Sequence, residues 1–109
     1  MKANELRIGN YVDIKHDEYE CESYQFDFES GWNMEYIHPI LLTEEWLMKF
    51  GFESDGIEWW NGVLSLGIYK DGLYYCPTED IHYRLGKEFK YVHQLQNLHH
   101  ALTDEELTF

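Results

Sequence analysis

Long apolar runs are missing from this sequence, in which consecutive apolar residues extend over only three or four positions. No basic-plus-apolar leader precedes Asn4, so neither a secretory signal nor a membrane span is expected. Cysteine is scarce as well, because Cys21 and Cys76 are the only two and neither belongs to a C-x-x-C pair. We expect both to be reduced thiols of a cytoplasmic protein rather than the halves of a disulfide.

Basic residues are also few. Eight lysines and arginines face twenty-one acidic residues, which gives a formal net charge of −13. Residues 13–58 concentrate this charge, with thirteen acids against Lys15 and Lys49 and a net of −11. Such a field repels the phosphates of nucleic acid and attracts basic protein surfaces or cations. Direct binding of DNA or RNA through phosphates is therefore not an expected function, and a basic protein surface is the expected partner.

Sequence patterns of known catalytic sites are missing too. The chain has no G-x-S-x-G motif and no glycine-rich phosphate loop. It has six histidines, but none of those in 93–100 lies four positions from another, the spacing that places two metal ligands on one helical face. A site assembled from His16, His38 or His82 with nearby carboxylates is the alternative left open. We predict no metal site, no cofactor and no enzymatic activity.

Aromatic residues, in contrast, are abundant. They make up 17% of the chain, and hydrophobic residues as a whole make up 44%. Acidic chains that stay disordered carry few aromatics, so this composition predicts a folded core. A length of 109 residues is typical of one domain, which we expect to span residues 1–109.

Alternation of apolar and polar residues predicts two N-terminal strands, over 6–14 and 24–29. The polar segment 16–23 between them is expected to be a hairpin tip or a loop. A short strand is expected at Tyr36 and Ile37. A short helix should follow at about 44–50, with Thr43 as its N-cap and Gly51 at its end.

Two turn signals, Asn61-Gly62 and Asp71-Gly72, predict a three-stranded meander over 57–76. In that register Trp60 would face Val63, and Tyr69 would face Tyr74. One more hairpin is expected over 81–92.

The spacing of apolar residues in the C-terminal segment predicts a helix at about 93–102 that buries Leu95, Leu98 and Leu102. The expected fold class is therefore α+β, with one curved antiparallel sheet and two packed helices.

Two surfaces are candidates for binding a partner. The first is acidic: Glu20 and Glu22, like Asp27 and Glu29, would point the same way on a strand, about 6.5 to 7 Å apart. This spacing is close to that of successive phosphates on one nucleic-acid strand. The alternative is that these acids form an ordinary solvated surface.

The second candidate surface is aromatic. Alternation along the meander places Trp60, Tyr69 and Tyr74 on one face, opposite a core face that contains Trp59 and Tyr75. Exposed aromatics surrounded by acids are typical of protein-binding hot spots. The alternative is that helices or the N-terminal strands cover this face.

Three segments, ELRIGNYV (5–12), LTEEWLMKFGFE (42–53) and KYVHQLQNLHHALTDEEL (90–107), resemble a set of small uncharacterised proteins from Bacteroidota and their phages. In this sequence Ile40-Leu41 stands where the set has a P-I-P run, and the acid-rich segment 16–36 is particular to this chain. The resemblance implies a small phage or prophage accessory protein and assigns no catalytic residues.

The expected function is that of an accessory protein which binds a basic surface of a host protein, such as the channel of a nucleic-acid-binding enzyme. In this role it would imitate nucleic acid, as inhibitors of the anti-CRISPR kind do. The alternatives are an adaptor module that self-associates through the aromatic surface and, third, an enzyme whose site the sequence does not reveal.

Overall fold

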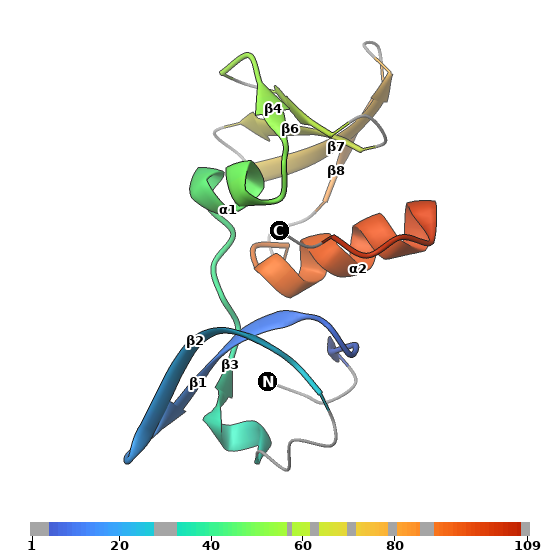
Figure 1. Ribbon diagram of the computed structural model, residues 1–109. Helices are drawn as coiled ribbons and strands as arrows, with labels where there is room; N and C mark the ends of the chain where they lie inside the picture. Colours follow the sequence, from blue (N-terminus) through green and yellow to red (C-terminus); the bar gives the residue numbers. More distant parts are fainter. Residues whose placement is uncertain are drawn as a thin grey trace. The chain divides into compact units, whose positions relative to one another are not determined.

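The computed structural model describes residues 5–27, 33–56, 58–61, 64–69, 72–78, 81–85 and 89–107. Over these ranges the chain forms two α-helices and two antiparallel sheets, which confirms the α+β class (Figure 1). The strands form a three-stranded and a five-stranded sheet rather than the single sheet that the sequence predicted.

Residue contacts divide the chain into two compact units. The N-terminal unit comprises Met1–Leu41 and Tyr91–Glu106, and the central unit comprises Leu42–Lys90 and Leu107–Phe109. The expectation of one domain stays a prediction.

The N-terminal unit contains the three-stranded sheet, in the order β2-β1-β3 (Figure 1). Its strands are β1 (Tyr11–His16), β2 (Tyr19–Gln25) and β3 (Ile37–His38). His16 pairs with Tyr19, so only two residues connect β1 to β2. The predicted placement of the second strand at 24–29 was therefore wrong for its start and its end, and most of segment 16–23 is strand. The short strand expected at Tyr36 and Ile37 is confirmed at Ile37.

A β-bulge interrupts the pairing of β1 and β2. Val12 pairs with Tyr24 and Ile14 pairs with Cys21, so two residues of β2 oppose Asp13 alone. Ser23 adopts the left-handed conformation there, with φ of 57°. The bulge leaves the backbone N–H of Ser23 without a partner in the ladder, and this N–H donates instead to Asp13 Oδ1 across 3.1 Å.

The hydrophobic core of the N-terminal unit lies on the inner face of this sheet. The bulge shifts the alternation by one residue, so Tyr24 still faces inward beside Val12. Tyr24 and Met34 pack against a cluster of buried residues, which are Leu6, Val12, Phe26 and Ile37.

Helix α2 (Val92–Thr103) confirms the predicted C-terminal helix. Tyr91 is the N-cap of this helix, and Gln94 Oε1 accepts a hydrogen bond from the backbone N–H of Tyr91 across 2.9 Å. The second strand of the predicted 81–92 hairpin was therefore wrong, because the helix begins at Val92. Residues 89–90 accordingly belong to no strand, and Tyr91 makes only an isolated bridge with Leu41. No helix in the described part of the chain is long and apolar enough to cross a membrane.

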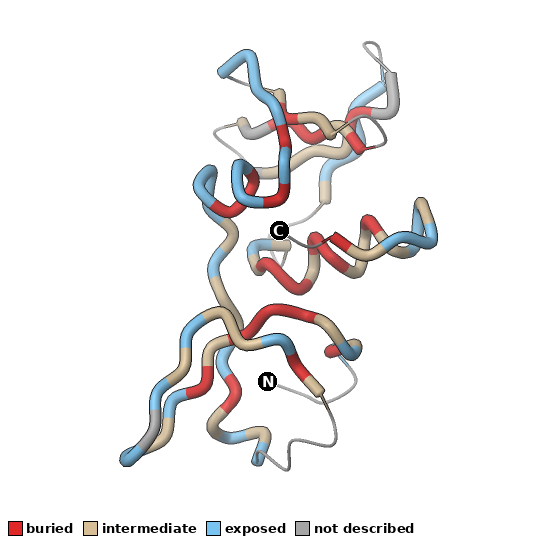
Figure 2. The backbone as a smooth tube through the Cα atoms, in the orientation of Figure 1, coloured by how far each residue is buried: buried red, intermediate tan, exposed pale blue. Residues whose placement is uncertain are grey.

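The predicted leucine stripe of α2 is only partly buried. Leu95 is fully buried and Leu98 is half-buried, but Leu102 is 48% exposed, so its assignment to the core was wrong. Buried positions recur along α2, as the burial colours show (Figure 2), and the residues at these positions are partly polar. They are Val92, His93, Leu95, Gln96 and His99.

The central unit begins with helix α1 (Glu44–Lys49), close to the predicted 44–50. Thr43 is its N-cap, since the Thr43 side chain accepts from the backbone N–H of Trp46 across 3.4 Å. Gly51 follows with φ of 86°, a conformation that glycine adopts without a steric cost. Trp46 and Leu47 are the buried residues of this helix.

The five-stranded sheet of the central unit is an antiparallel meander. Its strands, in spatial and sequence order, are β4 (Glu53–Ser54), β5 (Glu58–Trp60), β6 (Ser65–Tyr69), β7 (Gly72–Thr78) and β8 (Ile81–Arg84). The predicted meander and the first strand of the predicted 81–92 hairpin are therefore present, and β4 is an addition that the sequence did not reveal.

The register of this meander differs from the prediction by two residues at both turns. Trp60 pairs with Ser65 rather than Val63, and Tyr69 pairs with Gly72 rather than Tyr74. At the first turn, Asn61 Oδ1 accepts from the N–H of Leu64 across 2.9 Å and closes a longer loop than the predicted one. Gly62 lies outside the described residues. A shift of two residues leaves every side chain on its predicted face.

Candidate functional site

The acidic residues predicted to bind a partner fall on and just beyond β2. Glu20 and Glu22 are exposed on this strand, and Glu20 is paired with Lys15 of β1. Asp27 is half-buried and follows the end of β2, so the strand spacing assumed for Asp27 and Glu29 does not apply there. Glu29 lies outside the described residues. Two of the four acids thus share an exposed strand.

Aromatic residues of the same segment contribute to the core. Phe26 is buried, and Tyr24 is half-buried against the core cluster. Phe28 lies outside the described residues. Glu20 and Glu22 therefore stand on the solvent side of a strand that is anchored by its other side.

Charge is distributed unequally between the two units. The N-terminal unit contains 12 acidic residues against 3 lysines and arginines, whereas the central unit contains 9 against 5. The excess of negative charge thus coincides with the unit that contains β2. Its potential should attract cations and basic surfaces over distances of about one Debye length, roughly 8 Å at physiological salt.

The three predicted aromatic residues share one face of the central sheet, which we call the aromatic face (Trp60, Tyr69 and Tyr74). Trp60 pairs with Ser65, and Gly67 pairs with Tyr74, so alternation along β6 places all three on the same side. Each is half-buried. The rings of Tyr69 and Tyr74 meet edge to face, with centroids 5.2 Å apart.

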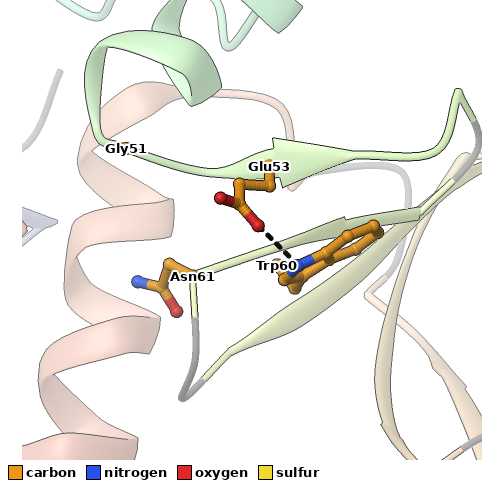
Figure 3. Close-up of a pocket in the computed structure, with 4 residues that line it drawn as sticks. All are labelled: Gly51, Glu53, Trp60 and Asn61. Atoms are coloured by element: carbon orange, nitrogen blue, oxygen red, sulfur yellow. Dashed lines mark hydrogen bonds between the residues drawn. The ribbon is translucent and has the colours of Figure 1, made fainter.

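Polar contacts fix the orientation of the aromatic face. Trp60 Nε1 donates to Glu53 Oε2 across 3.3 Å, between neighbouring strands (Figure 3). Burial of the Tyr69 phenol, and then the nearby Cys76 and Glu58, raise the pKa of Tyr69, which keeps its hydroxyl protonated as a hydrogen-bond donor. The face therefore combines apolar rings with donors and carboxylates.

Two hollows in the described surface of the central unit are large enough to compare with ligand sites. One, of about 280 Å³, is lined by Gly51, Glu53, Trp60 and Asn61 (Figure 3). The other, of about 220 Å³, lies between α1 and β7, and its lining is Leu42, Thr43, Glu44, Leu47 and Leu73. Both are smaller than the roughly 300 to 1,000 Å³ of usual small-molecule sites. Neither favours a small-molecule ligand over a protein partner.

Sequence reasoning missed one cluster of metal-binding residue types. Glu58, Cys76 and His82 each offer a ligand atom, and these atoms all lie within 4.8 Å of one another. The alternative site suggested from sequence included His82 but not Cys76. Of the three histidines considered there, only His82 belongs to such a cluster within the described ranges.

A polar network joins the two ends of the N-terminal unit. Gln96 Oε1 accepts from the backbone N–H of Tyr11 across 2.8 Å, and Gln96 Nε2 donates to the carbonyl of Gly9 across 3.2 Å. Asn97 Oδ1 accepts from Arg7 Nε and from Asn10 Nδ2. These contacts occupy the polar groups of Gln96 and Asn97 in packing, so they do not mark a catalytic site.

Comparison with models of protein families, with curated proteins and with solved structures gives no match to this chain.

Proposed function

We propose that this protein binds a basic surface of a host protein and acts there as a nucleic-acid-mimicking inhibitor of the anti-CRISPR kind. The observation that carries the proposal is the exposed acidic strand β2 in a unit with 12 acids against 3 bases. The setting is that of a small phage or prophage accessory protein in the host cytoplasm, which rests on the resemblance of its three sequence segments.

Charge and aromatic residues have different roles in this proposal. The field of the N-terminal unit accelerates encounter with a basic target, and this acceleration weakens as salt increases. Aromatic rings supply affinity at short range, because they bury a large apolar area with little loss of conformational freedom. An enzyme channel that binds nucleic acid offers the required basic surface.

The test compares two pairs of exposed acids of the N-terminal unit in a matched way. Glu20→Gln with Glu22→Gln removes two charges from β2, and Asp104→Asn with Glu105→Gln removes two charges after α2. Glu106 is not part of the control because it is paired with Arg7. Association rates of each variant with the partner identified by pull-down are measured at two salt concentrations.

We expect the β2 pair to slow association and to flatten its dependence on salt, while the control pair changes little. The complete set, in which Asp27→Asn and Glu29→Gln are added, should lower the rate further. If the β2 pair associates as fast as the parent at both salt concentrations, the acidic strand is a solvated surface and the proposal fails.

A second candidate function is self-association through the aromatic face. Its support is that Trp60, Tyr69 and Tyr74 share one side of the sheet and each keeps part of its surface exposed. Self-association of this kind changes little with ionic strength, whereas charge-led capture weakens steeply. Sedimentation of the parent and of Tyr74→Ala at low and high salt distinguishes the two functions.

A further inference from the structure

Three metal-binding residue types meet on the side of the central sheet that carries the aromatic face. Glu58 comes from β5, Cys76 from β7 and His82 from β8. Their ligand atoms all lie within 4.8 Å of one another, although the residues are up to 24 positions apart in sequence. The sheet therefore creates a juxtaposition that no local sequence motif encodes.

A β-bulge aligns Cys76 with His82. Tyr75 pairs with Tyr83 and Thr78 pairs with Ile81, so the two residues between them on β7 oppose His82 alone. One of these two residues is Pro77, which has no backbone N–H to donate to a regular ladder and is therefore typical of a bulge. Bulges of this kind redirect side chains and occur often beside functional sites.

Gly67 of β6 lies between the strands that carry Glu58 and Cys76. Glu58 pairs with Gly67 across β5 and β6, and Gly67 pairs with Tyr74 across β6 and β7. A Cβ at Gly67 would lie 2.5 Å from Cε2 of Tyr69, so glycine at this position leaves space for the ring of Tyr69, which stacks with His82.

We propose that Glu58, Cys76 and His82 bind one divalent metal ion of the zinc type, with the fourth coordination position open to water. A thiolate, an imidazole and a carboxylate form a mixed set of S, N and O ligands, which suits Zn²⁺ better than the all-oxygen sites of Ca²⁺ or Mg²⁺. Three protein ligands with one open position are also the usual arrangement of reactive rather than purely structural zinc.

The observed distances are close to those a metal requires. Zinc bonds of about 2.0 to 2.3 Å place the ligand atoms of a tetrahedral site roughly 3.3 to 3.8 Å apart. In this cluster no two ligand atoms are more than 4.8 Å apart. His82 is exposed and Glu58 is half-buried, so small side-chain rotations of these two residues close the difference. Cys76 is only 5% exposed and provides the fixed ligand.

The surroundings of the three residues fit a bound cation. The imidazole of His82 stacks against Tyr69, with centroids 6.0 Å apart and an interplanar angle of 27°, which orients the ring. Burial and then the Glu58 carboxylate raise the pKa of the Cys76 thiol, while a backbone hydrogen bond from Gly67 lowers it. A cation between thiol and carboxylate offsets their repulsion and displaces the thiol proton.

The test is a titration of the full-length reduced protein with Co²⁺, whose thiolate complexes absorb in the near ultraviolet. We expect one equivalent to bind with a thiolate charge-transfer band and Zn²⁺ to displace it. Cys76→Ser should abolish the band, and His82→Gln and Glu58→Gln should each weaken binding by about 10-fold or more. The matched controls Cys21→Ser and His38→Gln should bind like the parent.

Metal binding is measured without any partner, so this test is independent of the proposed function. Because His82 is exposed, His82→Gln should keep the melting temperature of the parent and remains informative even if Cys76→Ser fails to fold. A parent without a thiolate band overturns the site. So does a band that survives in Cys76→Ser, or unchanged affinity in both His82→Gln and Glu58→Gln.

Discussion

Arg7 donates from two guanidinium nitrogens to both carboxylate oxygens of Glu106, across 2.7 and 3.2 Å. The same guanidinium donates to Asn97 Oδ1 and to the backbone carbonyl of Gln96. The N-terminal segment that contains Arg7 and the C-terminal segment 96–106 therefore meet around one side chain.

Arg7→Lys should destabilise the fold. Lysine keeps the charge but loses the planar fork that contacts Glu106, Asn97 and Gln96 together. We expect the free energy of unfolding to fall by about 1 to 3 kcal/mol, as measured by urea denaturation. The control Lys49→Gln removes an exposed ion pair between Lys49 and Glu45 at 3.9 Å, and its free energy of unfolding should fall by less than about 0.5 kcal/mol. Equal urea midpoints for Arg7→Lys and the parent would contradict the prediction.

Local sequence signals were sufficient for the helices but not for the strand registers. Thr43 and Gly51 mark both ends of α1 because capping depends on nearby residues only. The first turn of the meander differs from the predicted two-residue turn because the Asn61 side chain accepts a hydrogen bond from the backbone N–H of Leu64. The bulge at Ser23 depends on Asp13 of the other strand, which local periodicity does not contain.

The candidate sites likewise divide into features that local sequence predicts and features that depend on contacts between strands. Alternation predicted the shared face of Trp60, Tyr69 and Tyr74, because a register shift of two residues does not change faces. The meeting of Cys76 with His82 required the bulge on β7. The three residues come from β5, β7 and β8, so sequence spacing alone did not reveal the cluster.

Substitutions along α2 should separate its buried and exposed leucines. Leu95 is fully buried, so Leu95→Ala should cost about 2 to 5 kcal/mol of unfolding free energy. Leu102 is 48% exposed, and Leu102→Ala should change stability by no more than about 0.5 kcal/mol. Thermal or urea unfolding of the two variants gives the comparison. A loss at Leu102 as large as that at Leu95 would show that the helix buries a different face.

His93 is the titratable group of α2 whose environment predicts a pH effect. It is 3% exposed and stacks on Tyr91, and its Nδ1 has no hydrogen-bond partner within the described part of the chain. Burial lowers the pKa of His93 because it disfavours the charged imidazolium, and the Glu5 carboxylate opposes this effect only in part.

The sign of the pH effect follows from the lowered pKa of His93. In the unfolded chain this histidine takes up a proton below about pH 6.5, while in the folded protein it stays neutral to lower pH. The unfolded state then binds more protons, so the free energy of unfolding should fall as the pH falls below about 6.5. Glutamine at position 93 cannot titrate, so His93→Gln should show a shallower slope between about pH 7 and 5, whatever its absolute stability. Urea unfolding at several pH values gives the slopes of the parent and the variant, and an unchanged slope in His93→Gln would mean that His93 titrates alike in both states.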